Sequence, residues 1–117
     1  MSIYKQRYEI DKDNLLKILA DKQAIDILTY LIKKPRSITD ISKQFMIPKS
    51  TAYRRVHELE SLGLVKAAGS IINEKGRRSY VYVSKVKSIN LSLTSGGLII
   101  DTELNNIKVE LLSLSHI

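Results

Sequence analysis

The sequence predicts a single α+β domain in which three helices precede a β-hairpin and a second β-rich stretch follows. Three observations predict it: apolar residues follow a helical period up to Gly63, they alternate with polar residues afterwards, and turn-forming residues divide the alternating part into hairpins. The chain has 117 residues, which suits one domain. Because 44% of them are hydrophobic, it can bury a core without a disulfide or a structural metal.

The first predicted helix covers residues 22–34, and weaker helical spacing precedes it in residues 15–19. Asp21 stands directly before it and belongs to a residue type that caps helix N-termini. Pro35 must end the helix, because proline lacks an amide proton and disfavours helical geometry in the preceding residue. Five apolar residues form one stripe and predict a core-facing helix: Ala24, Ile27, Leu28, Leu31 and Ile32.

Two further helices are predicted on either side of a short turn. Ser37-Ile38-Thr39-Asp40 fits a capping box, so the second helix should begin there and run to about Phe45. Met46-Ile47 makes the turn, and Pro48 stands at or just before the start of a third helix over residues 49–62. The sequence therefore predicts two helices joined by a turn of three or four residues.

After Gly63, a typical C-terminal residue of a helix, the apolar pattern changes to that of strands. Residues 64–68 and 79–84 are predicted strands, and the charged segment 73–78 between them is the predicted tip of their hairpin. A second hairpin is predicted on either side of Gly96-Gly97. Beyond Asn105-Asn106, both a further strand and a C-terminal helix fit the pattern, so both stay open.

These elements divide the chain into an N-terminal arm (1–13), a helical and hairpin domain (14–85) and a C-terminal extension (86–117). The extension carries more aliphatic residues than the small domain needs. We expect it to bury them against a second subunit in a two-fold symmetric contact. Extension of the chain's own sheet is the alternative.

The net charge of +7 is concentrated in the middle of the chain. Residues 33–87 contain thirteen Lys or Arg and four Asp or Glu, whereas the rest is slightly acidic. Such a distribution is expected of a protein that binds a polyanion, and a basic surface kept for solubility explains the charge equally well.

Several classes of function are excluded or unsupported. The chain has no cysteine, which excludes thiolate catalysis, thiolate-bound zinc, iron–sulfur clusters and disulfides. It has no apolar stretch of about 18 residues, and its start is too charged for a secretory signal, so we expect no membrane partner and a cytoplasmic location. No phosphate-binding motif or paired carboxylates favour an enzyme, and no cofactor is expected.

The third predicted helix has an apolar face and a polar face. Ala52, Val56 and Leu59 lie together and should face the core. Arg54 lies on the opposite face, where its guanidinium suits the O6 and N7 atoms of guanine in a major groove. The polar face as a whole consists of Ser50, Tyr53, Arg54, His57 and Ser61. Tyr53 and His57 are also explained as ordinary surface residues.

Neighbouring cations add candidate phosphate contacts. Lys49 and the free amides at the helix start favour a phosphate, and Arg55, near the buried edge, should reach either a phosphate or Glu58. The hairpin tip should lie on the backbone or in the minor groove, unless its charges only prevent edge-to-edge pairing. The candidate DNA-binding residues are Lys49, Ser50, Thr51, Tyr53, Arg54, Arg55, His57, Lys75, Arg77 and Arg78.

Residues 37–66, SITDISKQFMIPKSTAYRRVHELESLGLVK, resemble the winged helix-turn-helix of ArsR-like transcriptional regulators, in particular the small archaeal ones. The resemblance implies a homodimer that binds a partly palindromic DNA site, usually as a repressor. The metal sensors of that family carry a cysteine pair that this chain lacks, so no effector is assigned. The family often has glycine where Met46 stands, and a positive φ there would cost roughly 1 kcal/mol.

The sequence therefore predicts a winged helix-turn-helix that binds double-stranded DNA sequence-specifically and regulates transcription. Two alternatives stay open. One is an architectural chromatin protein that binds DNA without reading its sequence, because the charge supports it equally well. The other is a winged helix used for protein assembly through residues 86–117.

Overall fold

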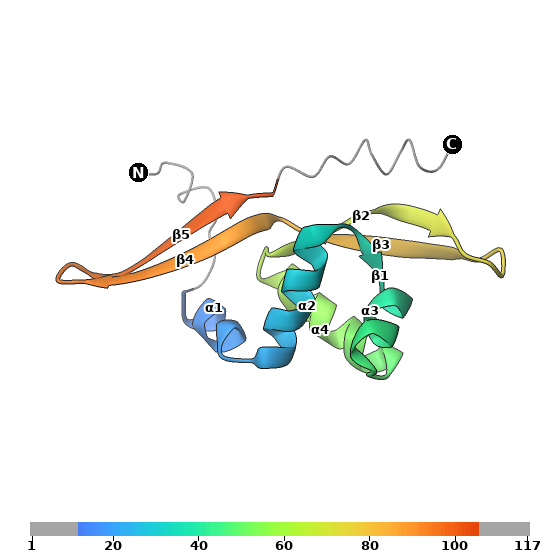
Figure 1. Cartoon of the computed structure of the whole chain (residues 1–117), viewed down its shortest axis with the longest axis horizontal. Coiled ribbons are helices and arrows are strands. Elements are labelled where there is room, and N and C mark those ends of the chain that lie inside the picture. Colours follow the sequence, from blue (N-terminus) through green and yellow to red (C-terminus); the bar gives the residue numbers. More distant parts are fainter. Residues whose placement is uncertain (1–11, 106–117) are drawn as a thin grey trace.

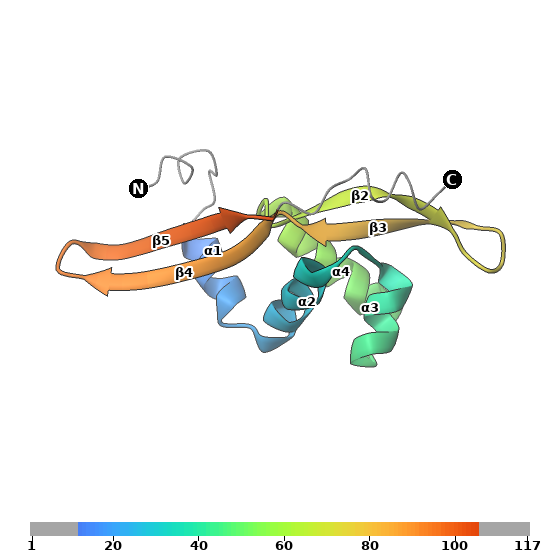
Figure 2. The same cartoon turned by 45° about the horizontal axis from the view of Figure 1, so that its top comes forward.

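A computed structural model describes residues 12–105 of the chain. Within this range the helices are α1 (Lys12–Leu19), α2 (Lys22–Lys33), α3 (Ile38–Phe45) and α4 (Lys49–Ser61). The strands are β1 (Arg36–Ser37), β2 (Val65–Ile72), β3 (Arg78–Ser84), β4 (Val86–Thr94) and β5 (Gly97–Leu104). The helices lie on one side of the strands (Figures 1 and 2), and the predicted α+β class is confirmed.

Local signals place the helix ends as the sequence predicts. The Asp21 carboxylate caps α2 by accepting from the amides of Gln23 and Ala24 at 3.0 and 3.2 Å. At α3 the capping box is complete: the Ser37 hydroxyl accepts from the Asp40 amide, and the Asp40 carboxylate accepts from the Ser37 amide. Each interaction satisfies backbone donors that a helix start would otherwise leave unpaired.

The turn between α3 and α4 has the strained residue that the sequence indicated. Met46 has φ 54° and ψ 50°, and its side chain is 90% exposed. The Ser42 hydroxyl donates to the Ile47 carbonyl at 2.6 Å and holds the turn. Pro48 then stands directly before α4, where its missing amide proton costs nothing. After α4, Gly63 takes φ 80° and ends the helix, as predicted.

The first sheet has the strand order β1-β3-β2, and all its pairs are antiparallel. Strand β2 runs to Ile72, beyond the predicted end at residue 68, with an irregularity between Ala67 and Gly69. The two-residue strand β1 was not predicted. It ties the start of α3 to the sheet through the pairs Arg36 with Tyr82 and Ser37 with Val81. The long β2–β3 hairpin projects past the helices as a wing (Figure 1).

The core lies between the helices and the strand ends nearest to them. The predicted inner residues of α2 are buried apart from Ile32, which is half-buried, and α4 contributes Ala52, Val56 and Leu59. Leu15 of α1 and Leu64 join the same cluster. The core therefore fixes the rotation of α4 about its axis and turns its opposite face to solvent.

Strands β4 and β5 form the predicted second hairpin, which projects in the opposite direction from the wing (Figure 1). Its base belongs to the core: Val86 is fully buried, and Ile89 and Ile100 pack against the core cluster. Leu91, which lies opposite Ile100, and Leu93, nearer the tip, are exposed, Leu93 by 83%. The two projecting hairpins give extents of 55 × 30 × 18 Å.

The outermost sequence predictions fall beyond the described residues. The predicted arm 1–13 overlaps α1, which begins at Lys12, and residues 1–11 lie outside the description. The alternatives of strand and helix for the segment after Asn105 also lie outside it.

Candidate nucleic-acid interface

The outward face of α4 is polar, exposed and continuous. Tyr53 is 52% exposed, and the side chains of Arg54 and His57 are 60% and 49% exposed. The rings of Tyr53 and His57 meet edge to face with centroids 4.3 Å apart. Ser50 and Ser61 are also exposed, whereas Thr51 is half-buried. The structure therefore brings the predicted outer face together on one side of the helix.

Two acidic residues lie beside this face. The carboxylate of Glu58 lies 3.5 Å from the Arg54 guanidinium. Glu60 lies 3.5 Å from Nδ1 of His57. The helical period explains both contacts, because residues three or four positions apart are neighbours on a helix surface. The two predicted base-reading side chains thus each have an acidic neighbour.

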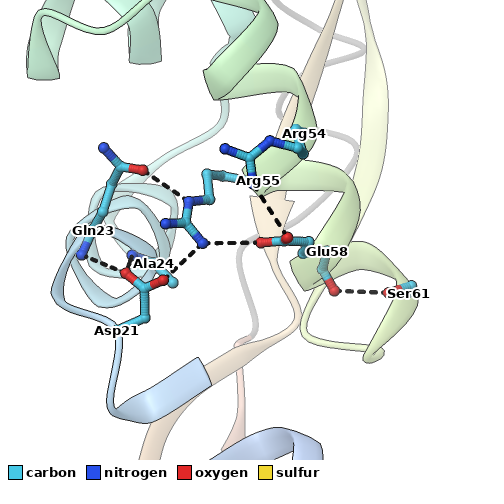
Figure 3. Close-up of polar contacts among 7 residues, drawn as sticks. All are labelled: Asp21, Gln23, Ala24, Arg54, Arg55, Glu58 and Ser61. Atoms are coloured by element: carbon cyan, nitrogen blue, oxygen red, sulfur yellow. Dashed lines mark hydrogen bonds and ion pairs between the residues drawn. The ribbon is translucent and has the colours of Figure 1, made fainter. Parts of the chain in front are cut away.

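Arg55 lies on the side of α4 that faces α2 (Figure 3). Its guanidinium contacts Asp21 at 2.7 Å and Glu58 at 3.2 Å, and it donates to the Gln23 side chain at 2.8 Å. The side chain is only 20% exposed. The sequence left a phosphate and Glu58 open as partners of Arg55, and the structure shows the contact with Glu58. A phosphate contact by Arg55 stays a prediction without support from this arrangement.

A polar chain therefore joins the start of α2 to the exposed face of α4 (Figure 3). Asp21 caps α2 and holds Arg55; Arg55 holds Glu58; and the other oxygen of Glu58 faces Arg54. The hydrogen bond from the Ala24 amide, together with the charge of Arg55, lowers the pKa of Asp21 below its usual value of 3.8. The carboxylate is consequently charged under ordinary conditions and keeps the chain intact.

The tip of the wing is a compact, cationic turn. The Asn73 side chain accepts from the amides of Lys75 and Arg77, both at 2.9 Å, and Gly76 supplies a φ of 76°. The Lys75 and Arg77 side chains are exposed and have no ion-pair partner among residues 12–105. Arg78 donates to the Ser70 hydroxyl across the two strands at 2.8 Å.

Residues 22–69 match the family model of the IclR helix-turn-helix domain. This segment, less than half of the chain, is similar to that domain. The similarity indicates a DNA-binding helix-turn-helix of the kind found in transcription regulators. The predicted class of winged helix-turn-helix is thereby confirmed, whereas the match names the IclR type and not the ArsR type. No curated protein matches the chain.

The IclR-type segment begins with α2 and ends within β2. The segment contains α3, α4 and the contacts of Arg55 with Gln23 and Glu58. It does not contain Asp21, the wing tip or the C-terminal hairpin. Between residues 12 and 105, no three His, Asp or Glu side chains lie close enough together to hold a metal ion. In the same range, no helix has both the length and the apolar character that a membrane span requires.

A cleft between the IclR-type domain and the wing contains residues that sequence reasoning missed. Lys43 and Thr39 of α3 line it together with Lys49 and the wing tip. Lys43 is one of the thirteen Lys or Arg in residues 33–87, and no sequence motif distinguishes it from the others. Its position opposite the wing depends on how α3 packs, and no pattern in the sequence reports that packing.

Proposed function

We propose that the chain is a sequence-specific transcription regulator that inserts α4 into the major groove of duplex DNA. The exposed face of Tyr53, Arg54 and His57 carries the proposal, because the core holds the opposite face and no described element covers this one. An α-helix fits the major groove, where base pairs present distinct donors and acceptors. Arg54 is the proposed guanine reader, with Ser50, Tyr53 and His57 beside it and Thr51 at the helix start.

The wing is the proposed second contact. Lys75 and Arg77 stand exposed at its tip and Arg78 at its edge, in reach of the sugar-phosphate backbone or the minor groove. Such contacts fix the position of a protein on the duplex, while base contacts supply the specificity. Lys49, exposed at the start of α4, is a further proposed phosphate contact.

Sequence-specific reading is favoured over an architectural role by the acidic residues on α4. Glu58 and Glu60 lie next to Arg54 and His57, and each would repel a phosphate backbone. A protein that only coats DNA gains nothing from acids at its contact face, because its affinity comes from neutralising phosphates. A protein that reads bases gains side chains held in defined positions.

The proposed regulator acts as a homodimer, and the C-terminal hairpin is its proposed contact. The pairing register puts Leu91 opposite Ile100 and Leu93 opposite Leu98, so these four share one face of the hairpin. A two-stranded hairpin is marginally stable alone, and exposed leucines at its far end favour a partner. Repression follows only from the resemblance to ArsR-like regulators, which itself stays a prediction.

Selection of bound fragments from random duplex DNA tests the proposal. We expect one enriched sequence arranged as an inverted repeat, bound at least ~10³-fold more tightly than random duplex. The same affinity for the enriched fragment and for random duplex would favour the architectural alternative. An enriched single half-site would retain sequence reading but contradict the homodimer.

A further inference from the structure

The cleft between the wing and the helix-turn-helix is lined by basic side chains from three separate elements. Lys43 comes from the last turn of α3, Lys49 from the first turn of α4, and Lys75 and Arg77 from the tip of the wing. All four side chains are exposed, and none has an ion-pair partner within the described part of the chain.

Two acidic side chains also line the cleft, and one of them is already engaged. Asp40 accepts from the Ser37 amide at 2.9 Å as part of the capping box. Glu74 stands at the exposed tip of the wing. The four cations therefore outnumber the acids by two, and the cleft favours an anionic occupant.

We propose that this cleft holds the sugar-phosphate backbone of one DNA strand, with Lys43 as a phosphate contact. The proposal rests on the proposed function and follows from its geometry. If α4 lies in a major groove and the wing tip reaches the adjacent minor groove, the strand that separates the two grooves must pass between them. The cleft lies between the wing and α3, with Lys49 at the start of α4 beside it, so its cations lie on both sides of that path.

A polyanion fits this cleft better than a small enclosed anion does. The cations are solvent-exposed and belong to α3, α4 and the wing. Exposed lysines along a strand act through the release of condensed counterions, which needs no enclosed site.

The test compares Lys43→Gln with Lys33→Gln in the full chain. Both lysines are exposed in the last turn of a helix, but Lys33 does not line the cleft. Affinity for the duplex selected from random DNA is measured over a range of salt concentrations. We expect Lys43→Gln to reduce the slope of log affinity against log salt by about 0.9 per occupied cleft, and Lys33→Gln to leave the slope unchanged.

Sequence preference separates this proposal from the proposed function. Phosphate contacts carry no sequence information, so Lys43→Gln should keep the preference for the selected site over random duplex. Duplexes with single neutral methylphosphonate linkages give the second readout. A neutral linkage that lowers the affinity of the wild type for the duplex, but not the affinity of Lys43→Gln, identifies the phosphate that Lys43 contacts.

Equal salt slopes for the wild type and Lys43→Gln, with every neutral linkage affecting both equally, would overturn the cleft proposal and leave base reading by α4 intact. Loss of the sequence preference in Lys43→Gln would also overturn it, because a base contact would then be involved. A wild-type chain that binds no duplex would overturn both proposals.

Discussion

Replacing Asp21 removes two interactions at once, and two different substitutions separate them. The carboxylate caps α2 through the amides of Gln23 and Ala24, and it pairs with Arg55 of α4 at 2.7 Å. Asp21→Ala removes the cap and the ion pair. Asp21→Ser removes the ion pair alone, because serine is as good a capping residue as aspartate.

The expected losses follow from the geometry. A lost N-cap costs about 1 kcal/mol of unfolding free energy. The pair with Arg55 is part-exposed, at 20% and 30% of the two side chains, so solvent screening limits it to roughly 0.5 to 1 kcal/mol. We therefore expect Asp21→Ala to lose about 2 kcal/mol and Asp21→Ser less than half of that. Arg55 keeps Gln23 and Glu58 as partners in both variants.

Urea unfolding followed by circular dichroism measures both losses, and the pH dependence identifies the charge. The folded pKa of Asp21 lies below its usual value of 3.8, so its contribution is fully present above that value and is lost as the pH falls through the folded pKa. The stability difference between the wild type and Asp21→Ser should therefore shrink as the pH is lowered below about 4.

Two results would refute this reasoning. Equal losses for Asp21→Ala and Asp21→Ser would mean that the cap contributes nothing. A difference between the wild type and Asp21→Ser that stays constant down to pH 2 would mean that the charge of Asp21 does not stabilise the fold.

Three further substitutions test separate features. Glu58→Gln should raise the affinity for random duplex about fivefold and lower the preference for the selected site, because a charge beside the DNA is lost and Arg54 is freed; an unchanged preference in binding assays would contradict this. Met46→Gly should stabilise the chain by about 0.5 kcal/mol in urea unfolding, because relief of the left-handed backbone exceeds the entropy that glycine adds to the unfolded chain, and a less stable variant would contradict this. Leu93→Lys should give a monomer in sedimentation, because it places a charge on the proposed apolar contact; a variant with the mass of the dimer would exclude this face as the contact.

Elements with local signals were predictable from the sequence. Asp21, the Ser37–Asp40 capping box and Gly63 mark helix ends through contacts with backbone atoms no more than a few residues away. The outer face of α4 was predictable because the helical period fixes which residues oppose Ala52 and Val56. The second hairpin was predictable from alternation and its glycine pair.

Features that depend on packing between distant segments were not predictable. Strand β1 has only two residues, too few for any period, and exists because β3 lies beside it. The partner of Arg55 at the start of α2 is more than thirty residues away, so a helical wheel places the side chain near the buried edge but cannot name Asp21. The position of Lys43 opposite the wing was not predictable either, because it also depends on packing between distant segments.

The central claim is that the outward face of α4 reads bases, and Arg54→Ala tests it most directly. Affinities of the wild type and the variant are measured on the selected duplex and on its single-base variants at one salt concentration. We expect Arg54→Ala to weaken binding to the selected duplex by roughly 1 to 3 kcal/mol and to lose discrimination at one base pair per half-site. Unchanged discrimination at every base pair would contradict base reading by this face.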